Sequence, residues 1–464
     1  MTYLPACAVL IGGLFAATGL SGPVAAQDWP PPGQTCEAPD SWFPHAQTPE
    51  PDNAGFTGGS FCAFHQWSWQ TFLWLTQDDA TGQPRFLSMT DPHALIDKST
   101  PALLPRMKKS DLGETFDEFL QAGPDGILID QQGNPVFYSQ YLNDAFVSFI
   151  KENDLTNPAN VQAFNPDTPF PVDSLELKLS WKIVEDYEDT SDFFTMDGQV
   201  ATLVEDNGKI RAAPDKPRNV KLALVGFHIG GVVNGHPEMI WATFEHKKNA
   251  PNVIPDHMGN LTPDTVISNE TGYTFYEAGV EFKDCNFNPA VTGQMELDVE
   301  TQTFSPVTQV CRQYEFGNDP EDPVNNQDNI KSNDQAIASL NAGVHGKLQD
   351  LWKNYHQVGA IWFSDGTKFA PNLALDSDAL LIGSFKLSNA TIETFTQTQS
   401  TENNCFRCHN TLQRFPSSRG QVEMGLDPLP ALELNISHAF VNIYFWSQEN
   451  EKSKGANSGA QESE

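Results

Sequence analysis

Five consecutive residues near the C-terminus, Cys405-Phe406-Arg407-Cys408-His409, have types and spacing that indicate a particular chemistry. Cys-x-x-Cys-His is the attachment site of a c-type haem, in which two thiols hold the porphyrin covalently and the histidine binds iron. On a helical turn, residues i, i+3 and i+4 share one face, so Cys405, Cys408 and His409 can meet one planar macrocycle. The sequence therefore predicts one covalent haem c, with His409 as its proximal axial ligand.

A Cys-x-x-Cys pair also occurs in zinc sites and in thioredoxin-like redox sites. A structural zinc site needs two further ligands, and the chain has no second Cys-x-x-Cys to supply them. A thioredoxin-like dithiol normally follows a strand in a βαβ unit, and no such unit is readable around Cys405. Haem c is therefore the better interpretation of the motif.

The ligand on the far side of the iron decides what such a haem does. Electron carriers close that position with Met or His, whereas enzymes often leave it open. Met424 and His438 are the candidates that follow His409. His228 and His246 could also reach the iron if their strands pack on the haem, although a structural role is commoner for such histidines. The sequence leaves this ligand open.

Two functions are compatible with the motif. The first is the transfer of single electrons, which requires no catalytic residue. The second is a haem enzyme of the peroxidase or oxygenase kind, for which Glu245, His246 and Arg407 could act near iron, although their spacing selects none of them. The chain contains no Gly-x-Ser-x-Gly or His-Glu-x-x-His motif of a hydrolase. We expect electron transfer, with the enzyme as the alternative and its catalytic residues unknown.

The charge of the chain limits its partners. The 464 residues include 60 acidic and 27 basic residues, which gives a net charge of −33. Such a charge argues against binding to nucleic acid or to an anionic membrane surface. It suits an exported protein whose redox partner protein has a basic surface.

The N-terminus has the pattern of an export signal. An apolar run from Ala8 to Leu20 is followed by Val24-Ala25-Ala26, and residues 1–26 are therefore expected to be removed as a signal peptide. No Lys or Arg precedes the apolar run, which departs from the usual pattern. No later segment has the roughly 20 apolar residues of a membrane span. We expect a periplasmic or secreted protein.

The remaining cysteines fit such a compartment. Apart from Cys7 in the signal and the two haem cysteines, the chain has Cys36, Cys62, Cys285 and Cys311. An even number of cysteines in an oxidising compartment indicates two disulfides, for which three pairings are possible. We prefer Cys36–Cys62 and Cys285–Cys311, because each pair closes a local loop.

Hydrophobic periodicity predicts an α+β chain, in which a β-rich, mostly antiparallel N-terminal domain precedes a mainly helical C-terminal haem segment like that of cytochromes c. An aromatic helix is expected over 61–75, strands over 175–183, 221–229 and 239–246, a hairpin about Gly208, further strand-like runs over 273–282 and 295–310, and helices over 335–355 and 388–397. The expected divisions are a signal peptide (1–26), a Pro/Gly-rich arm (27–59), the β-rich domain (60–315), an acidic linker (316–334), the haem segment (335–447) and a disordered tail (448–464).

Four short segments together with the haem motif resemble one group of proteins. The segments are Leu177-Lys-Leu-Ser-Trp-Lys182, Val225-Gly-Phe-His-Ile229, Trp241-Ala-Thr-Phe-Glu-His-Lys-Lys-Asn-Ala-Pro251 and Asn389-Ala-Thr-Ile-Glu-Thr-Phe395. The group is the set of large exported bacterial proteins with a single c-type haem motif near the C-terminus, and the resemblance extends over about residues 60–445. It implies haem, export and a β-rich N-terminal part, and carries over Cys405, Cys408 and His409 as haem-binding residues. It implies no substrate.

Overall fold

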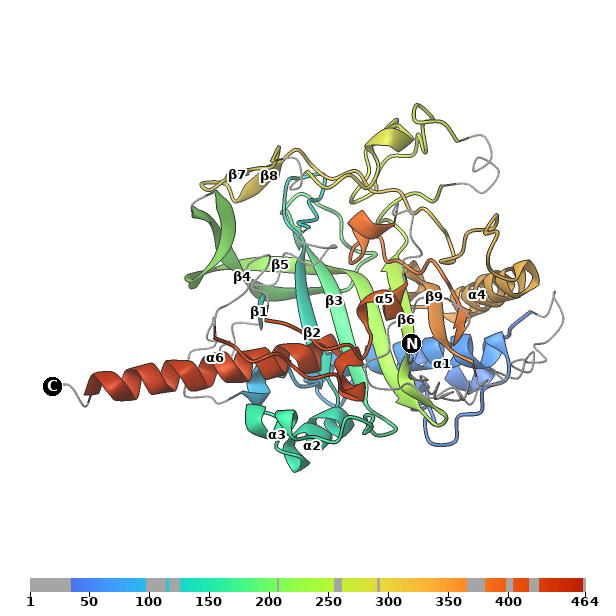
Figure 1. The fold of residues 1–464 in the computed structure, drawn as a ribbon. Helices are drawn as coiled ribbons and strands as arrows, with labels where there is room; N and C mark the ends of the chain where they lie inside the picture. Colours follow the sequence, from blue (N-terminus) through green and yellow to red (C-terminus); the bar gives the residue numbers. More distant parts are fainter. Residues whose placement is uncertain are drawn as a thin grey trace, which may run out of the picture.

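An eight-stranded sheet lies at the centre of the computed structural model (Figure 1). The structure describes residues 35–96, 114–116, 126–206, 208–253, 261–289, 293–364, 380–397, 404–416 and 425–461. The strands are β1 (Glu114–Phe116), β2 (Phe137–Leu142), β3 (Leu175–Val184), β4 (Thr195–Asp206), β5 (Lys209–Val233), β6 (His236–His246), β9 (Tyr355–Phe363) and β10 (Leu381–Gly383), with a separate hairpin of β7 (Glu296–Asp298) and β8 (Thr303–Ser305). The helices are α1 (Phe61–Thr76), α2 (Asp144–Glu152), α3 (Pro158–Gln162), α4 (Gln327–Lys347), α5 (Cys405–Cys408) and α6 (His438–Gln461).

The long strand β5 organises this sheet. Its first half pairs with β4, and its second half pairs with β3 on one side and β6 on the other. The order β1-β4-β5-β6-β9-β10 results, with β2 added through β3. These pairs are antiparallel except β1 with β4. The mostly antiparallel, β-rich character expected from the sequence is therefore confirmed.

The two faces of the sheet carry different side chains. Alternate residues of β3, among them Leu177, Leu179 and Trp181, lie in one apolar core with aromatic residues of α1 and apolar residues of α4. The opposite face is covered by the C-terminal residues, where Trp241 of β6 and Phe406 of α5 belong to a second apolar core that includes α2 and the first turns of α6. The haem motif thus lies on the side of the sheet opposite α1.

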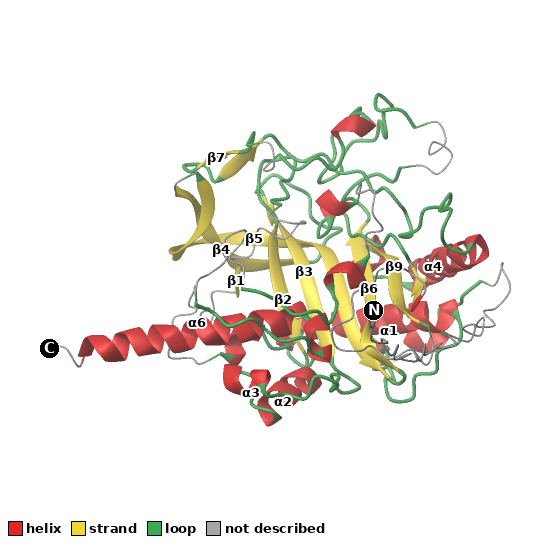
Figure 2. Cartoon of the chain, in the orientation of Figure 1, coloured by secondary structure: helices red, strands yellow, loops and turns green. Residues whose placement is uncertain are grey.

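The prediction of a mainly helical C-terminal segment is wrong. Residues 355–363 and 381–383 are strands, and β9 pairs with β6 inside the main sheet, so this region completes the sheet that the preceding residues begin. Loops make up much of the C-terminal part in Figure 2, and α5 is a single helical turn. The sequence pattern did not predict β9, because this strand is apolar on both faces. Periodicity alone does not distinguish such a strand from a buried helix.

Residues 388–397 also differ from the expected helix, since they form turns and one 3₁₀ turn at Thr394–Thr396. The side-chain oxygen of Asn389 accepts hydrogen bonds from the backbone and hydroxyl of Thr391, and its amide donates to Phe244 O. Such bonds offer the backbone an alternative to the helix. The expected helix over 335–355 is shifted too, because Asn326 caps α4 at Gln327 and the helix ends at Lys347.

Local predictions in the N-terminal part are confirmed. Ser60 caps α1 by accepting from Ala63 N, and most of the helix circumference is buried. Strand β3 lies where alternation placed it, and the β5–β6 pair and the hairpin between β4 and β5 also lie where they were expected.

Other local predictions differ from the structure, since residues 273–282 form no named strand and residues 295–310 contribute only β7 and β8. Helix α6 continues to Gln461, within the tail expected to be disordered.

Both expected disulfides are present. Cys36 is bonded to Cys62, with 5.4 Å between the Cα atoms, and Cys285 to Cys311, with 5.6 Å. Two disulfides are consistent with an exported protein. None of the helices in the described ranges has the length and apolar character of a membrane span.

His65 of α1 is a buried core histidine. Its Nε2 lies 2.9 Å from Asn333 Oδ1 and its Nδ1 lies 3.1 Å from Gln357 Nε2. Burial lowers the pKa of His65 from 6.5 to about 4, although the hydrogen bond with Asn333 acts in the opposite direction. The folded protein therefore holds this imidazole neutral at a pH where the unfolded chain protonates it.

This difference predicts a loss of stability in acid. Because the pKa is lower in the folded state, the contribution of neutral His65 is present above about pH 6.5 and is lost as the pH falls towards about 4, by about 3 kcal/mol. Urea unfolding across this range should show the loss in the parent protein and a smaller one in His65→Gln. Other buried acids, such as Asp130, affect both proteins alike, so the difference between the two curves measures His65. Parallel curves would contradict the prediction.

Candidate haem-binding site

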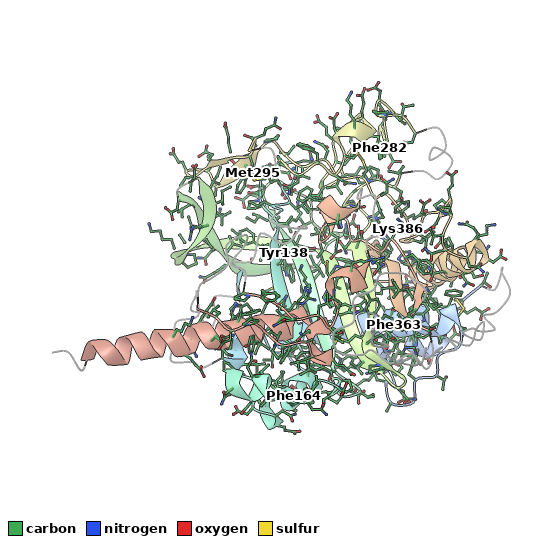
Figure 3. All side chains as sticks on the ribbon, in the orientation of Figure 1. Tyr138, Phe164, Phe282, Met295, Phe363 and Lys386 are labelled. Atoms are coloured by element: carbon green, nitrogen blue, oxygen red, sulfur yellow. A yellow bond between two sulfur atoms is a disulfide. The ribbon has the colours of Figure 1, made fainter. Side chains whose placement is uncertain are left out.

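The motif residues begin with one helical turn, as their spacing predicted. Asn404 caps α5 by accepting from Phe406 N at 3.1 Å, and His409 N donates to Cys405 O at 2.7 Å. Phe406 is fully buried, and its ring centre lies 4.6 Å from that of Phe363 on β9, which Figure 3 labels. This contact fixes the turn on the sheet and leaves Cys408 exposed and Cys405 partly exposed, both as free thiols.

The imidazole of His409 is held on both ring faces and at one nitrogen. Its ring centre lies 3.9 Å from that of Trp241 and 4.0 Å from that of His438, with tilts of 35° and 20°. Two rings so close and so nearly parallel must cover opposite faces of His409, because on one face they would overlap. Its Nδ1 lies 2.7 Å from Ile436 O. The ring is therefore fixed before any metal binds.

This arrangement determines which nitrogen of His409 can bind a metal. A carbonyl oxygen only accepts, so Nδ1 carries the proton and Nε2 keeps its lone pair. Metal-binding histidines typically donate their other N–H to such an acceptor. Burial holds the pKa of His409 well below its usual value, and the neighbouring His438 lowers this pKa further. The imidazole is thus neutral, as an iron ligand must be.

The surrounding residues fit a bound haem better than a zinc ion. The described parts of the chain contain no group of three or more His, Cys, Asp or Glu side chains that could hold a metal ion. Three buried N–H groups at the motif, on Trp241 Nε1, Asn404 Nδ2 and Arg414 Nε, have no hydrogen-bond partner among the described residues. Unpaired buried donors are uncommon and indicate a missing partner, such as a bound group with acceptor atoms.

A row of polar side chains crosses the sheet on the side of the motif. Gln140 of β2, Lys178 of β3, His228 of β5 and Thr243 of β6 are direct neighbours in register. His228 Nε2 lies 3.1 Å from both carboxylate oxygens of Glu393. The strands of the β-rich part therefore lie beside the haem motif.

Electrostatic effects connect this row with the thiols. Burial raises the pKa of Cys408, and Glu393 raises it further, whereas Arg414 and Lys178 lower it. Burial also raises the pKa of Glu393, but His228, Lys178 and the Asn389 amide outweigh it, and the pKa lies below its usual value. Glu393 is thus a carboxylate close to Cys408.

The residues after the motif are tied back to it. Arg414 Nη2 donates to Cys408 O at 2.6 Å and to Asn410 O at 3.2 Å, and the Arg414 backbone forms a bridge with Leu429. Asn435 Nδ2 donates to Leu412 O at 2.9 Å. These bonds fix residues 404–416, which we call the haem loop, against the chain that leads into α6.

The candidates for the far side of the iron are not brought together. Met424 lies outside the described residues. His438 lies against the face of His409, with its Nε2 3.2 Å from Cys408 O. Two axial imidazoles that bind one iron at about 2 Å lie end to end, with ring centres roughly 6 Å apart. His438 would therefore have to leave this stack in order to bind on the far side.

The other residues considered for catalysis are divided between two places. His246 stacks on Phe193 at 3.6 Å, and Glu245 forms a buried ion pair with Arg312, so both have structural partners. His228, in contrast, lies with Glu393 in the row beside the motif. Trp241 and Glu393 lie at the site, but no sequence signal assigned either of them to it.

Comparison of the chain with protein-family models, with curated proteins and with solved structures finds no match.

Proposed function

We propose that the protein binds one haem c covalently through Cys405 and Cys408, uses His409 as the proximal ligand, and transfers single electrons. A bound haem supplies iron that changes between two oxidation states. The observation that carries the proposal is the geometry of His409. Its Nδ1 is 2.7 Å from the Ile436 carbonyl, its two faces are covered by Trp241 and His438, and Nε2 remains for a metal.

The role of the protein in electron transfer is to keep the iron site unchanged between oxidation states. A rigid proximal histidine serves this, because a ring held on both faces loses little freedom when it binds a metal. The exposed Cys408 places one edge of the attachment site at the surface, where a partner can approach. For the far side, Met424 remains the candidate, since His438 is held against His409.

The alternative is a haem enzyme, and the His228–Glu393 pair favours it. A histidine that shares a hydrogen bond with a carboxylate is a suitable proton donor and acceptor in peroxide or oxygen chemistry. The pair lies in the polar row beside the motif, with Lys178 as the register neighbour of His228. This function requires an open far side of the iron, whereas electron transfer does not.

Carbon monoxide separates the two functions. We expect the visible spectrum of the reduced holo-protein to be low-spin and unchanged by carbon monoxide, because the far-side ligand blocks its access. Met424→Ala should then bind carbon monoxide, and Met295→Ala, on the loop before β7, is the matched control. Rapid carbon monoxide binding by the parent protein, with peroxide turnover that His228→Gln abolishes, would replace electron transfer with the enzyme.

We also propose that residues 1–26 direct export and that the mature protein is periplasmic or secreted. The two disulfides support this, because such bonds persist in oxidising compartments. Covalent haem attachment at a Cys-x-x-Cys-His motif requires reduced thiols until the haem is added. N-terminal sequencing of the protein recovered from the periplasm or medium should begin at Gln27, and an intact Met1 would contradict this expectation.

A further inference from the structure

The haem loop has a charge opposite to that of the whole protein. Residues 404–416 contain Arg407 and Arg414 and no Asp or Glu, in a chain with a net charge of −33. Arg414 lies directly at the motif, because its Nη2 donates to Cys408 O at 2.6 Å and to Asn410 O at 3.2 Å. The nearby carboxylate of Glu393 is hydrogen-bonded to His228, whose Nε2 lies 3.1 Å from both of its oxygens.

The same loop also exposes an aromatic side chain. Phe415 is 64% exposed, the highest value of any phenylalanine among the described residues, and it directly follows Arg414. Cys408 is exposed on the same loop, joined to Arg414 by the bond from its guanidinium to Cys408 O. An exposed aromatic residue next to an arginine has the composition that protein interfaces favour at their centre.

We propose that the haem loop is the docking surface for a redox partner protein, and that this partner presents an acidic surface with an apolar site for Phe415. The inference rests on the proposed haem, because electrons pass most readily where the attachment site reaches the surface. It differs from the basic partner that the net charge suggests. At ordinary salt concentrations, interactions between charges more than about 10 Å apart are screened. The charged residues around the contact therefore influence docking more than the net charge of the protein does.

The two expectations can be separated with charged electrode surfaces. Gold electrodes are coated with thiol layers that end in carboxylates, which stand in for an acidic partner, or in ammonium groups. At about 0.1 M salt, where charges farther than about 10 Å from the contact are screened, we expect the haem of the holo-protein to exchange electrons several-fold faster with the carboxylate layer, and more salt should reduce this rate. A faster exchange with the ammonium layer, or equal exchange with both, would overturn the proposal.

Variants test the loop itself. Arg414→Gln should slow exchange with the carboxylate layer several-fold. Arg211→Gln is the control and should not slow it; the side chain of Arg211, on β5, is 58% exposed. Phe415→Ser should slow exchange with a mixed carboxylate and methyl layer, and it keeps every bond of Arg414. An unchanged rate in both haem-loop variants would overturn the proposal. Each variant is first checked by its visible spectrum, so that absence of haem is recognised as failure of the proposed haem site and not of docking.

Discussion

Replacement of Cys405 and Cys408 with alanine is expected to remove all covalently bound haem. Each thiol forms one bond to the porphyrin, and with both absent only the bond from His409 to iron would hold it. Mass spectrometry of protein produced in a host with cytochrome maturation should show one added haem in the parent and none in the double variant. The haem of the parent should also remain with the polypeptide after extraction with acidic acetone.

A second pair of cysteines provides the matched control. Cys36→Ala with Cys62→Ala removes one disulfide and leaves the haem motif unchanged, so full haem content is expected. The loop of 26 residues predicts a loss of about 3 kcal/mol in the free energy of unfolding by the chain-entropy model. His409→Ala should keep the covalent haem and alter the spin state of its iron. A parent protein with the mass of the bare polypeptide would refute the haem site altogether.

Short-range features of this fold could be predicted from the sequence. Alternation over 175–183 gave β3, because side chains of a strand point to opposite faces and one face lies against α1. The disulfide pairs could be chosen because each closes a short loop, and loop closure is entropically easier over short separations. The haem motif itself is local, since its geometry needs only one helical turn.

Long-range contacts could not be predicted in the same way. Trp241 meets His409 because β6 and α5 pack against each other, and nothing in either segment states that they meet. Strand β9 pairs with β6 although more than a hundred residues separate them in sequence. Because of this separation, the local sequence pattern could not predict that β9 belongs to the sheet. Asn389 bonds to Thr243 Oγ1 and Phe244 O across this packing, so tertiary contacts prevented the helix that local pattern suggested.

The largest effect on stability is expected at Arg312, whose guanidinium binds Glu245 of β6 inside the protein. The two side chains are 3% and 0% exposed. Glu245 Oε1 also accepts from Ala390 N at 2.7 Å, and Arg312 Nη1 donates to Asn252 Oδ1. The pair thus joins β6, the loop after it, the Cys285–Cys311 region and the residues that lead to Glu393.

Arg312→Met should therefore lower the free energy of unfolding by about 3–5 kcal/mol, because it leaves the carboxylate of Glu245 buried without its cation. Guanidinium unfolding near neutral pH measures the change. Lys283→Met is the matched control, since its ion pair with Glu281 is exposed to solvent and should contribute little to the free energy of unfolding. Adding Glu245→Gln to Arg312→Met should recover part of the loss, because the uncompensated charge is then gone while an acceptor for Ala390 N remains. If Arg312→Met costs no more than Lys283→Met, the pair does not hold this region together.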